Sequence, residues 1–323
     1  MINGNSLILQ FGNETTYGSL ATAERQIKVA SESFKPTYNK KEEGLLTGGK
    51  AKGKLETMSL KTEGQVSTLG RPDDLGMFFK AGLGVEADVV SAGETAYKHT
   101  FNAIGTDETD SLPSLCAYVD RKTDVFTYNG LKIDSFGFSA EPEDYLKLDL
   151  TFTGKDEGTK GTLNSNLSTS PLKAFKFRHG KVKVAGEEIA DITSIKFSYE
   201  NSLDSSIQTT DTGLYFKEPE CGTRNITTDI EMLYTKDTEA LRNDYYKTDE
   251  EVSLELIFTS DEFIEDGVPY SMKIIIPANQ VSDASANFGS AETIKQSMTL
   301  QATENGVNEL ITIELVNGYS DKY

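Results

Sequence analysis

The sequence predicts a mainly β fold made of two tandem β-sandwich or barrel units, each with one short α-helix. Three observations support this prediction. Apolar and polar residues alternate with a period of two in several segments. The hydrophobic fraction is only 37%, Trp is absent, and Thr, Ser and Gly are plentiful, which suits short strands and turns. The order of strand and helix recurs about half a chain further on.

The strands are predicted from this alternation. Ile133, Phe136 and Phe138 form one apolar row, and apolar residues occupy every second position from 146 to 152. Residues 311–315 alternate in the same way. A strand that is apolar on one side only is half buried, so we expect antiparallel sheets with one face on a core and the other toward solvent or a partner.

Two segments have helical character. The first covers about residues 73–80, directly after a proline, and Gly82 is expected to end it. The second covers about residues 238–247, with Asp237 or Thr238 as the expected N-cap. Each helix follows a predicted strand and leads to another strand.

The positions of these helices predict an internal duplication. Placing Leu75 on Leu241 gives an offset of 166 residues, which also places Glu63 on Asp229. The alternative is a chance alignment of two strand-rich halves.

A similar offset of 165 places residues 146–150 on residues 311–315. The predicted units are residues 1–168 and residues 172–323. Between them lies the polar segment 158–171, which is rich in Gly, Ser and Thr and typical of a linker.

Each half contains a polar, Gly-containing segment before the strand that leads to the helix, at about 40–53 and 201–222. In a monomer such segments are surface loops, and in an assembly they are arms that reach the next subunit. The candidate arm residues are Lys40, Lys41, Glu42, Glu43, Gly44, Asp204 and Asp211.

The charge of the chain restricts its partners. With 51 acidic and 32 basic side chains the formal charge is −19, the opposite sign from the one that a nucleic-acid binder needs. The same sign suits a surface that lets DNA pass without holding it. The first residues lack a basic leader, and no apolar run approaches the roughly 20 residues of a membrane span. We expect a soluble protein without a signal peptide and without membrane contact.

Candidate catalytic groups are few. His99 and His179 are the only histidines, and no nucleophile motif surrounds either. Cys116 and Cys221 are far apart in the sequence, so two isolated thiols are expected, and none of these four residues has the paired spacing of a zinc site. The sequence therefore predicts no enzyme activity, no metal and no cofactor.

Several segments, in order, resemble the bacteriophage tail tube protein (major tail protein) family. Phe11–Ala21 is similar to the Glu-Thr-x-Tyr-Gly stretch near the start of many such proteins, and Leu69–Lys80 to the family's helix after a Gly-rich strand. Tyr97–Phe101 and Leu112–Tyr118 resemble two later strands of the family. The likeness departs at Leu115-Cys116, where a hydroxyl is common, and it is fainter in the second half.

This resemblance implies a structural subunit whose sheets join edge to edge into rings, stacked into a hollow, negatively charged tube through which DNA passes during ejection. If each chain holds two tail-tube-like units, three chains would form a pseudo-hexameric ring. The alternative is a hexamer of single-unit chains with an extra outer domain. The implied partners are further copies, a tape measure protein, and tail terminator or baseplate proteins. The implied location is the virion tail, assembled in the cytoplasm of the host bacterium.

The alternation in residues 227–232 places Asp229 and Glu231 on one face of a strand, opposite Ile230 and Met232. Together with Glu63 they are the predicted channel-lining residues, although an exposed outer face would show the same alternation. Two other classes remain open: a non-enzymatic adhesin or carbohydrate-binding β-sandwich module, which the lack of Trp disfavours, and a hydrolase that uses carboxylates.

Overall fold

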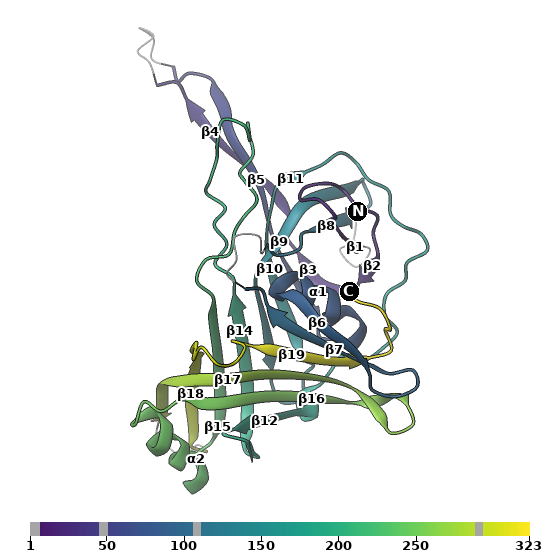
Figure 1. Cartoon of the computed structure of the whole chain (residues 1–323). Coiled ribbons are helices and arrows are strands. Elements are labelled where there is room, and N and C mark those ends of the chain that lie inside the picture. The colour runs from purple at the N-terminus through teal and green to yellow at the C-terminus, as the bar shows by residue number, and fades with distance from the viewer. Residues whose placement is uncertain (1–6, 45–50, 106–110, 288–292) are drawn as a thin grey trace.

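The computed structural model describes residues 7–44, 51–105, 111–287 and 293–323, and strands dominate them (Figure 1). The elements in chain order are β1 (Ile8–Asn13), β2 (Arg25–Ile27), β3 (Val29–Glu32), β4 (Lys35–Glu42), β5 (Leu55–Leu69), α1 (Pro72–Leu83), β6 (Gly84–Ser91), β7 (Tyr97–Ala103), β8 (Leu115–Asp120), β9 (Val125–Ala140), β10 (Lys147–Gly154), β11 (Asp156–Glu157), η2 (Phe177–His179), β12 (Gly180–Val184), β13 (Glu187–Ile189), β14 (Ile192–Glu200), β15 (Asn225–Leu233), α2 (Lys236–Leu241), η3 (Arg242–Tyr246), β16 (Val252–Glu265), β17 (Val268–Asn287), β18 (Lys295–Ala302) and β19 (Thr312–Asn317).

One antiparallel sheet, which we call the main sheet, runs through the whole chain. Its order is β3 with β4, then β5, β10, β9, β14, β15, β18 and the last part of β17. The pairing of β9 with β14 joins the two halves of the chain. The first parts of the long strands β9 and β17 leave the main sheet and enter outer sheets.

The outer sheets have matching orders. In the first half the order is β2, β1, β8, β9 and β11. In the second half it is β13, β12, β16, β17 and β19, and the hairpin of β6 and β7 extends this sheet beyond β19. Every pairing in one half therefore has a counterpart in the other, and the β6–β7 hairpin is extra.

The register shifts also fall at matching places. Residues with no partner in the ladder interrupt β3 at Ala30 and β14 at Thr193. Others interrupt β9 at Asp134 and β17 at Ser282. The ladder between β8 and β9 shifts after Leu115, and the ladder between β16 and β17 shifts after Val252.

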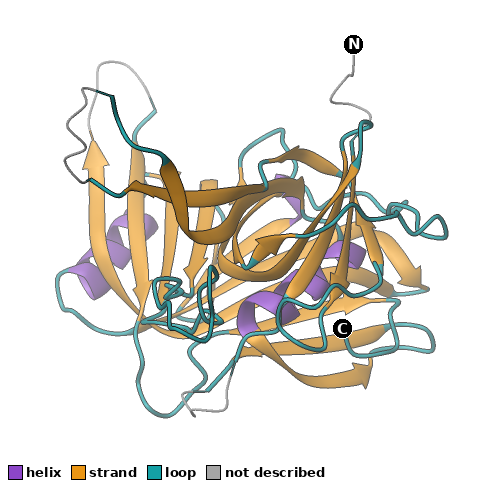
Figure 2. Cartoon of the chain, turned by 90° about the horizontal axis from the view of Figure 1, so that it is seen from above, coloured by secondary structure: helices purple, strands orange, loops and turns teal. Residues whose placement is uncertain are grey.

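The core lies on one face of the main sheet, because buried side chains alternate along its strands. Residues 61–69 of β5 and residues 225–233 of β15 have the same order of buried and more exposed positions. Where the halves meet, Phe136 stacks on Tyr199 with ring centroids 4.9 Å apart, and Phe138 stacks on Phe197 at 6.1 Å. The helices lie against the strands (Figure 2). Most of the described elements are strands, so the fold is mainly β, as predicted.

Both predicted helices are present, but their ends differ from the prediction. α1 continues past Gly82 and ends at Gly84, whose φ of 95° is a backbone conformation that glycine adopts readily. α2 is capped by Thr235 and not by Asp237 or Thr238, because the Thr235 hydroxyl accepts a hydrogen bond from the Thr238 N–H. The helical path then continues as the π-helix η3.

The segment predicted as a linker is attached to the first half over part of its length. Gly158 N–H donates to Thr127 O at 2.8 Å. The Gln10 side-chain amide donates to the Asn164 carbonyl at 3.0 Å and accepts from the Asn164 N–H at 2.9 Å. The predicted match of residues 146–150 with 311–315 is wrong. β10 lies between β5 and β9, and the strand in the corresponding place between β15 and β17 is β18, whereas β19 pairs with β17 and β7.

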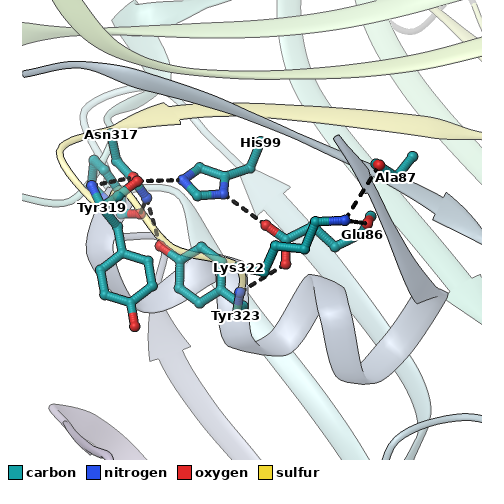
Figure 3. A network of polar contacts seen from close by, with 8 residues as sticks. Glu86, Ala87, His99, Asn317, Tyr319, Lys322 and Tyr323 are labelled. Atoms are coloured by element: carbon teal, nitrogen blue, oxygen red, sulfur yellow. Dashed lines mark hydrogen bonds and ion pairs between the residues drawn. The ribbon is translucent and has the colours of Figure 1, made fainter. Parts of the chain in front are cut away.

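The last residues of the chain form a buried polar network over α1 (Figure 3). His99 Nδ1 lies 2.8 Å from Glu86 Oε1, and both side chains are fully buried. His99 Nε2 lies 2.8 Å from the Tyr319 carbonyl, and the Tyr323 N–H donates to Glu86 Oε2 at 2.7 Å. A Cβ at Gly76 would lie 2.1 Å from the Tyr323 ring, so glycine makes room for this ring on α1.

Candidate assembly surfaces

The face of the main sheet opposite the core, which we call the open face, carries all three predicted channel residues. Asp229 and Glu231 lie two positions apart on β15. Glu63 lies on β5, four strands away across the sheet, about 19 Å, and six residues along β5 from Leu69, which lies in the same row as Asp229. The structure therefore brings Asp229 and Glu231 together and leaves Glu63 separate on the same face.

Each of these carboxylates has a local partner. Glu63 lies 2.7 Å from Lys61 Nζ, and Asp229 accepts from Thr299 Oγ1 at 2.6 Å. Glu231 lies 2.7 Å from Lys295 Nζ, and this hydrogen bond lowers the pKa of the Glu231 carboxyl below its usual value. Exposed pairs of this kind contribute little to stability.

The open face is rich in hydroxyl groups and close to charge balance. Ser31, Ser33, Thr37, Ser67, Ser135, Thr151, Ser198, Ser297 and Thr299 are among its hydroxyl-bearing side chains. Its acidic residues are Glu63, Asp149, Glu200, Asp229, Glu231 and Asp283, and its basic residues are Lys35, Lys61, Lys147, Lys196 and Lys295. Six carboxylates against five ammonium groups leave one excess negative charge at these described positions. Most of the chain's charge of −19 therefore lies on other surfaces.

The two predicted arms run side by side as one projection (Figure 1). The hairpin of β4 and β5 carries Lys40, Lys41 and Glu42 on β4, followed by Glu43 and Gly44, and the rest of the predicted first arm up to residue 50 lies outside the described residues. The loop between β14 and β15, with Asp204 and Asp211, follows this hairpin.

Backbone and side-chain contacts fix the loop to the hairpin. Leu60 N–H donates to Leu214 O at 2.8 Å, and Gln208 Nε2 donates to Met58 O at 3.1 Å. The projection also carries exposed apolar side chains that the sequence analysis missed: Tyr38, Leu55, Met58, Ile207 and Leu214. Such side chains far from a core are typical of a contact surface.

The main sheet has two edges whose outer sides no described strand covers. One edge is β3 with β4, and the other is the last part of β17. At the first edge the Phe34 carbonyl accepts from Arg121 at 2.9 Å and from the Tyr128 hydroxyl at 3.2 Å. At the second, the Ala284 carbonyl accepts from Arg242 Nε at 3.2 Å. Uncovered edges favour pairing with another chain, and these arginines satisfy part of each edge.

The candidate catalytic groups do not converge. His99, on β7, belongs to the buried network over α1, and His179, in η2, lies 3.1 Å from Asp261 on β16. Cys116 and Cys221 are both free thiols, and burial raises the pKa of Cys116 to about 11. In the described part of the chain, no three His, Cys, Asp or Glu side chains are grouped to hold a metal ion. The described residues contain no helix long and apolar enough to cross a membrane.

Comparisons with known proteins bear on the family of the chain. A family model described as "Phage tail tube protein" matches residues 4–302. Among solved structures, the chain is similar to the SPP1 tail tube determined by solid-state NMR and cryo EM, with 11% identity over 58% of this chain and 79% of that chain. The TM-score of 0.24 is too low to carry an argument about strand arrangement. No curated protein matches the chain.

Proposed function

This chain belongs to the phage tail tube protein family and is a structural subunit of the viral tail, and we propose that three copies close into a pseudo-hexameric ring that stacks into the tube. The observation that carries the proposal is the repeated strand network with its matching register shifts. A hydrogen-bonded sheet with two uncovered edges can join further copies edge to edge, and a ring leaves no edge open. Contacts that repeat along the ring axis then produce an open-ended tube.

Two units in each chain are supported by independent matches. The last residues of β5 and β15, Leu69 and Leu233, are 164 residues apart, and so are the first residues of α1 and α2. This spacing also superimposes the burial patterns of the two strands. An offset of 164 replaces 166, so that Asp229 corresponds to Gln65 and Glu63 corresponds to Thr227. The predicted boundary between 168 and 172 lies in the segment between β11 and β12, which supports this division.

We assign the open face to the channel. At its described positions, hydroxyl groups and nearly balanced charges would give phosphates few cations to bind, so DNA would pass without specific binding. Glu63, Asp229 and Glu231 would line this channel. In this arrangement the channel has a weak negative charge at the described positions, and the repulsion of DNA that the composition predicts would be correspondingly mild.

The projection formed by the β4–β5 hairpin and the 201–224 loop is proposed to contact the next ring. Exposed apolar side chains there would be covered by stacking, which gives the contact a hydrophobic driving force. The ends of the tube would meet a tape measure protein and terminator or baseplate proteins, and assembly would take place in the host cytoplasm. The proposed role involves no catalysis and no cofactor.

The carbohydrate-binding alternative lacks a stacking surface among the described residues. The exposed aromatic side chains Tyr38, Tyr145, Phe263 and Tyr319 lie on different elements, and a sugar-binding platform needs rings grouped on one face. We therefore keep the tube as the single proposed function.

Electron cryomicroscopy and native mass spectrometry of the purified protein test the proposal. The expected ring has three times the subunit mass of 35.4 kDa, a central channel and a wall with six similar units. The open face should line the channel and the projection should touch the adjacent ring. A closed ring of six chains would contradict the trimer, and monomers that persist at high concentration would contradict the ring itself.

A further inference from the structure

We propose that the uncovered edge of β17 pairs antiparallel with the uncovered edge of β4 in the next copy of this chain, with Asp283 opposite Thr37. The inference rests on the proposed ring and names the residues that close it. The pairing of β9 with β14 inside the chain supplies the register.

The junction inside the chain is well defined. It pairs β9 with β14 from Ser135 opposite Glu200 to Ala140 opposite Ile195. The Asn201 N–H donates to the Asp134 carbonyl at 2.7 Å, just outside the Ser135–Glu200 pair. This bond identifies Ser135 and Glu200 as a pair without mutual hydrogen bonds, in which the Cα atoms approach to about 4.5 Å.

The register shifts identify which residues at the uncovered edges correspond to the residues of this inner junction. Ser135 follows the shift residue Asp134 in β9, and Asp283 follows the corresponding residue Ser282 in β17. On the other strand, Glu200 lies seven positions after the shift residue Thr193. On β3 and β4 the corresponding shift residue is Ala30, and Thr37 lies seven positions after it. Counting from the shifts therefore places Asp283 opposite Thr37, Ala284 opposite Pro36 and Ser285 opposite Lys35.

The backbone groups at both edges fit this register. In the inner junction the residues opposite each other one step along, Phe136 and Tyr199, exchange hydrogen bonds, and their counterparts are Ala284 and Pro36. Pro36 has no N–H to donate to the Ala284 carbonyl. That carbonyl already accepts from Arg242 of its own chain, so it stays satisfied, while the Ala284 N–H remains to donate to the Pro36 carbonyl.

The side chains fit as well. Asp283, Thr37 and Lys35 are on the open face, and a lysine diagonal to an aspartate is a favourable cross-strand neighbour.

The ladder between copies should be shorter than the ladder within the chain. Beyond Lys35 the Phe34 carbonyl already accepts hydrogen bonds from Arg121 and Tyr128 of its own chain. Alanines also replace Phe136 and Phe138 on the core side, at positions 284 and 286. The junction between copies is therefore the weaker one, which lets each chain fold before rings close.

Disulfide trapping tests the register. The variant Thr37→Cys with Asp283→Cys should form disulfides between copies when rings assemble under mild oxidation. In antiparallel pairs without mutual hydrogen bonds the Cα atoms are close enough for a disulfide. Non-reducing gels should show a covalently closed species of three chains. The matched inner control, Ser135→Cys with Glu200→Cys, should link within one chain and leave its mass unchanged.

An off-register control keeps the test specific. Ser33→Cys with Asp283→Cys places the thiols four residues apart along the proposed ladder, about 13 Å, and should give at least tenfold less cross-linking. The unaltered chain, with Cys116 and Cys221, shows the background. If the paired variant does not fold, amide exchange of the unaltered protein replaces it, and the Ala284 amide, which would donate to the Pro36 carbonyl, should become protected on assembly.

The outcomes separate this inference from the proposed function. Rings seen by microscopy without the Thr37–Asp283 disulfide, or with equal trapping of the off-register pair, would overturn the register and leave the tube subunit intact. A closed species of six chains would support the register and contradict the trimer. Failure to form any ring would overturn both.

Discussion

The two halves of the chain share a strand network but hold their helices differently. α1 has ten buried residues and lies between the main sheet and the layer of β6, β7 and β19. α2 and η3 follow the equivalent strand, yet only Thr238 is buried there, and Leu241, Tyr245 and Tyr246 are partly buried. The β6–β7 hairpin and the last residues of the chain cover α1, and the described residues of the second half include no counterpart of that hairpin.

This difference shows that the strands and the helices are stabilised by different interactions. Backbone hydrogen bonds and alternation fix the strands in both halves, because each pair of strands satisfies the other's polar groups. A helix depends on what covers its outer side, since burial of apolar surface supplies most of its stability in a protein. We therefore expect the second half to retain its strands while its helix opens more readily.

The largest expected effect concerns the helices themselves. Phe79→Ala on α1 removes a ring that contacts Phe101, Phe136 and Phe138, and it should lower the free energy of unfolding by about 3–5 kcal/mol. Loss of an aromatic ring in the second half, by Tyr245→Ala on η3, should cost about 1 kcal/mol, because that ring is only partly buried. Urea unfolding of the unassembled subunit, followed by circular dichroism, measures both. Equal losses of unfolding free energy would show that both helical segments contribute equally to stability, which would contradict the expected difference.

The buried start of α1 should make stability depend on pH. Burial raises the pKa of Asp74 from 3.8 to about 6. The folded chain thus binds this proton more tightly than the unfolded chain, so the favourable contribution present below pH 4 is lost as pH rises to 6 and above. The full change corresponds to about 3 kcal/mol.

Asp74→Asn should therefore gain stability relative to the unaltered chain between pH 4 and pH 7, measured by urea unfolding at each pH. Asp266→Asn, in the exposed turn between β16 and β17, is the control and should show no such trend. A stability difference for Asp74→Asn that stays constant over this range would contradict the assigned burial of the ionised group.

The smallest effect concerns the start of α2, which has the side-chain cap that α1 lacks. Thr235→Ala removes the hydroxyl that accepts the Thr238 N–H and should cost about 1 kcal/mol, with faster amide exchange confined to residues 236–246. Thr235→Ser keeps the hydroxyl and should retain most of the protection. Exchange that accelerates throughout the main sheet would instead show that α2 and the sheet open together.

Much of the fold could be predicted from local pattern. Alternation identified β9, β10, β15 and β19, and both helices were placed correctly apart from their ends, because periodicity records which side of an element is buried. The mainly β fold and the family were likewise predicted from residues near each other in the sequence. For the candidate site, the same alternation correctly put Asp229 and Glu231 on one strand face.

Tertiary structure decided which elements are neighbours. No local pattern shows that β18 and not β19 corresponds to β10, that the two arms lie together, or that Arg121 and Arg242 occupy the uncovered edges. Nor does the total charge show where the carboxylates lie. Each of these depends on groups far apart in the chain, whose approach is set by the closure of the whole sheet and not by any one segment. The sequence by itself determined the faces of the strands, and only the folded chain decided their partners and their edges.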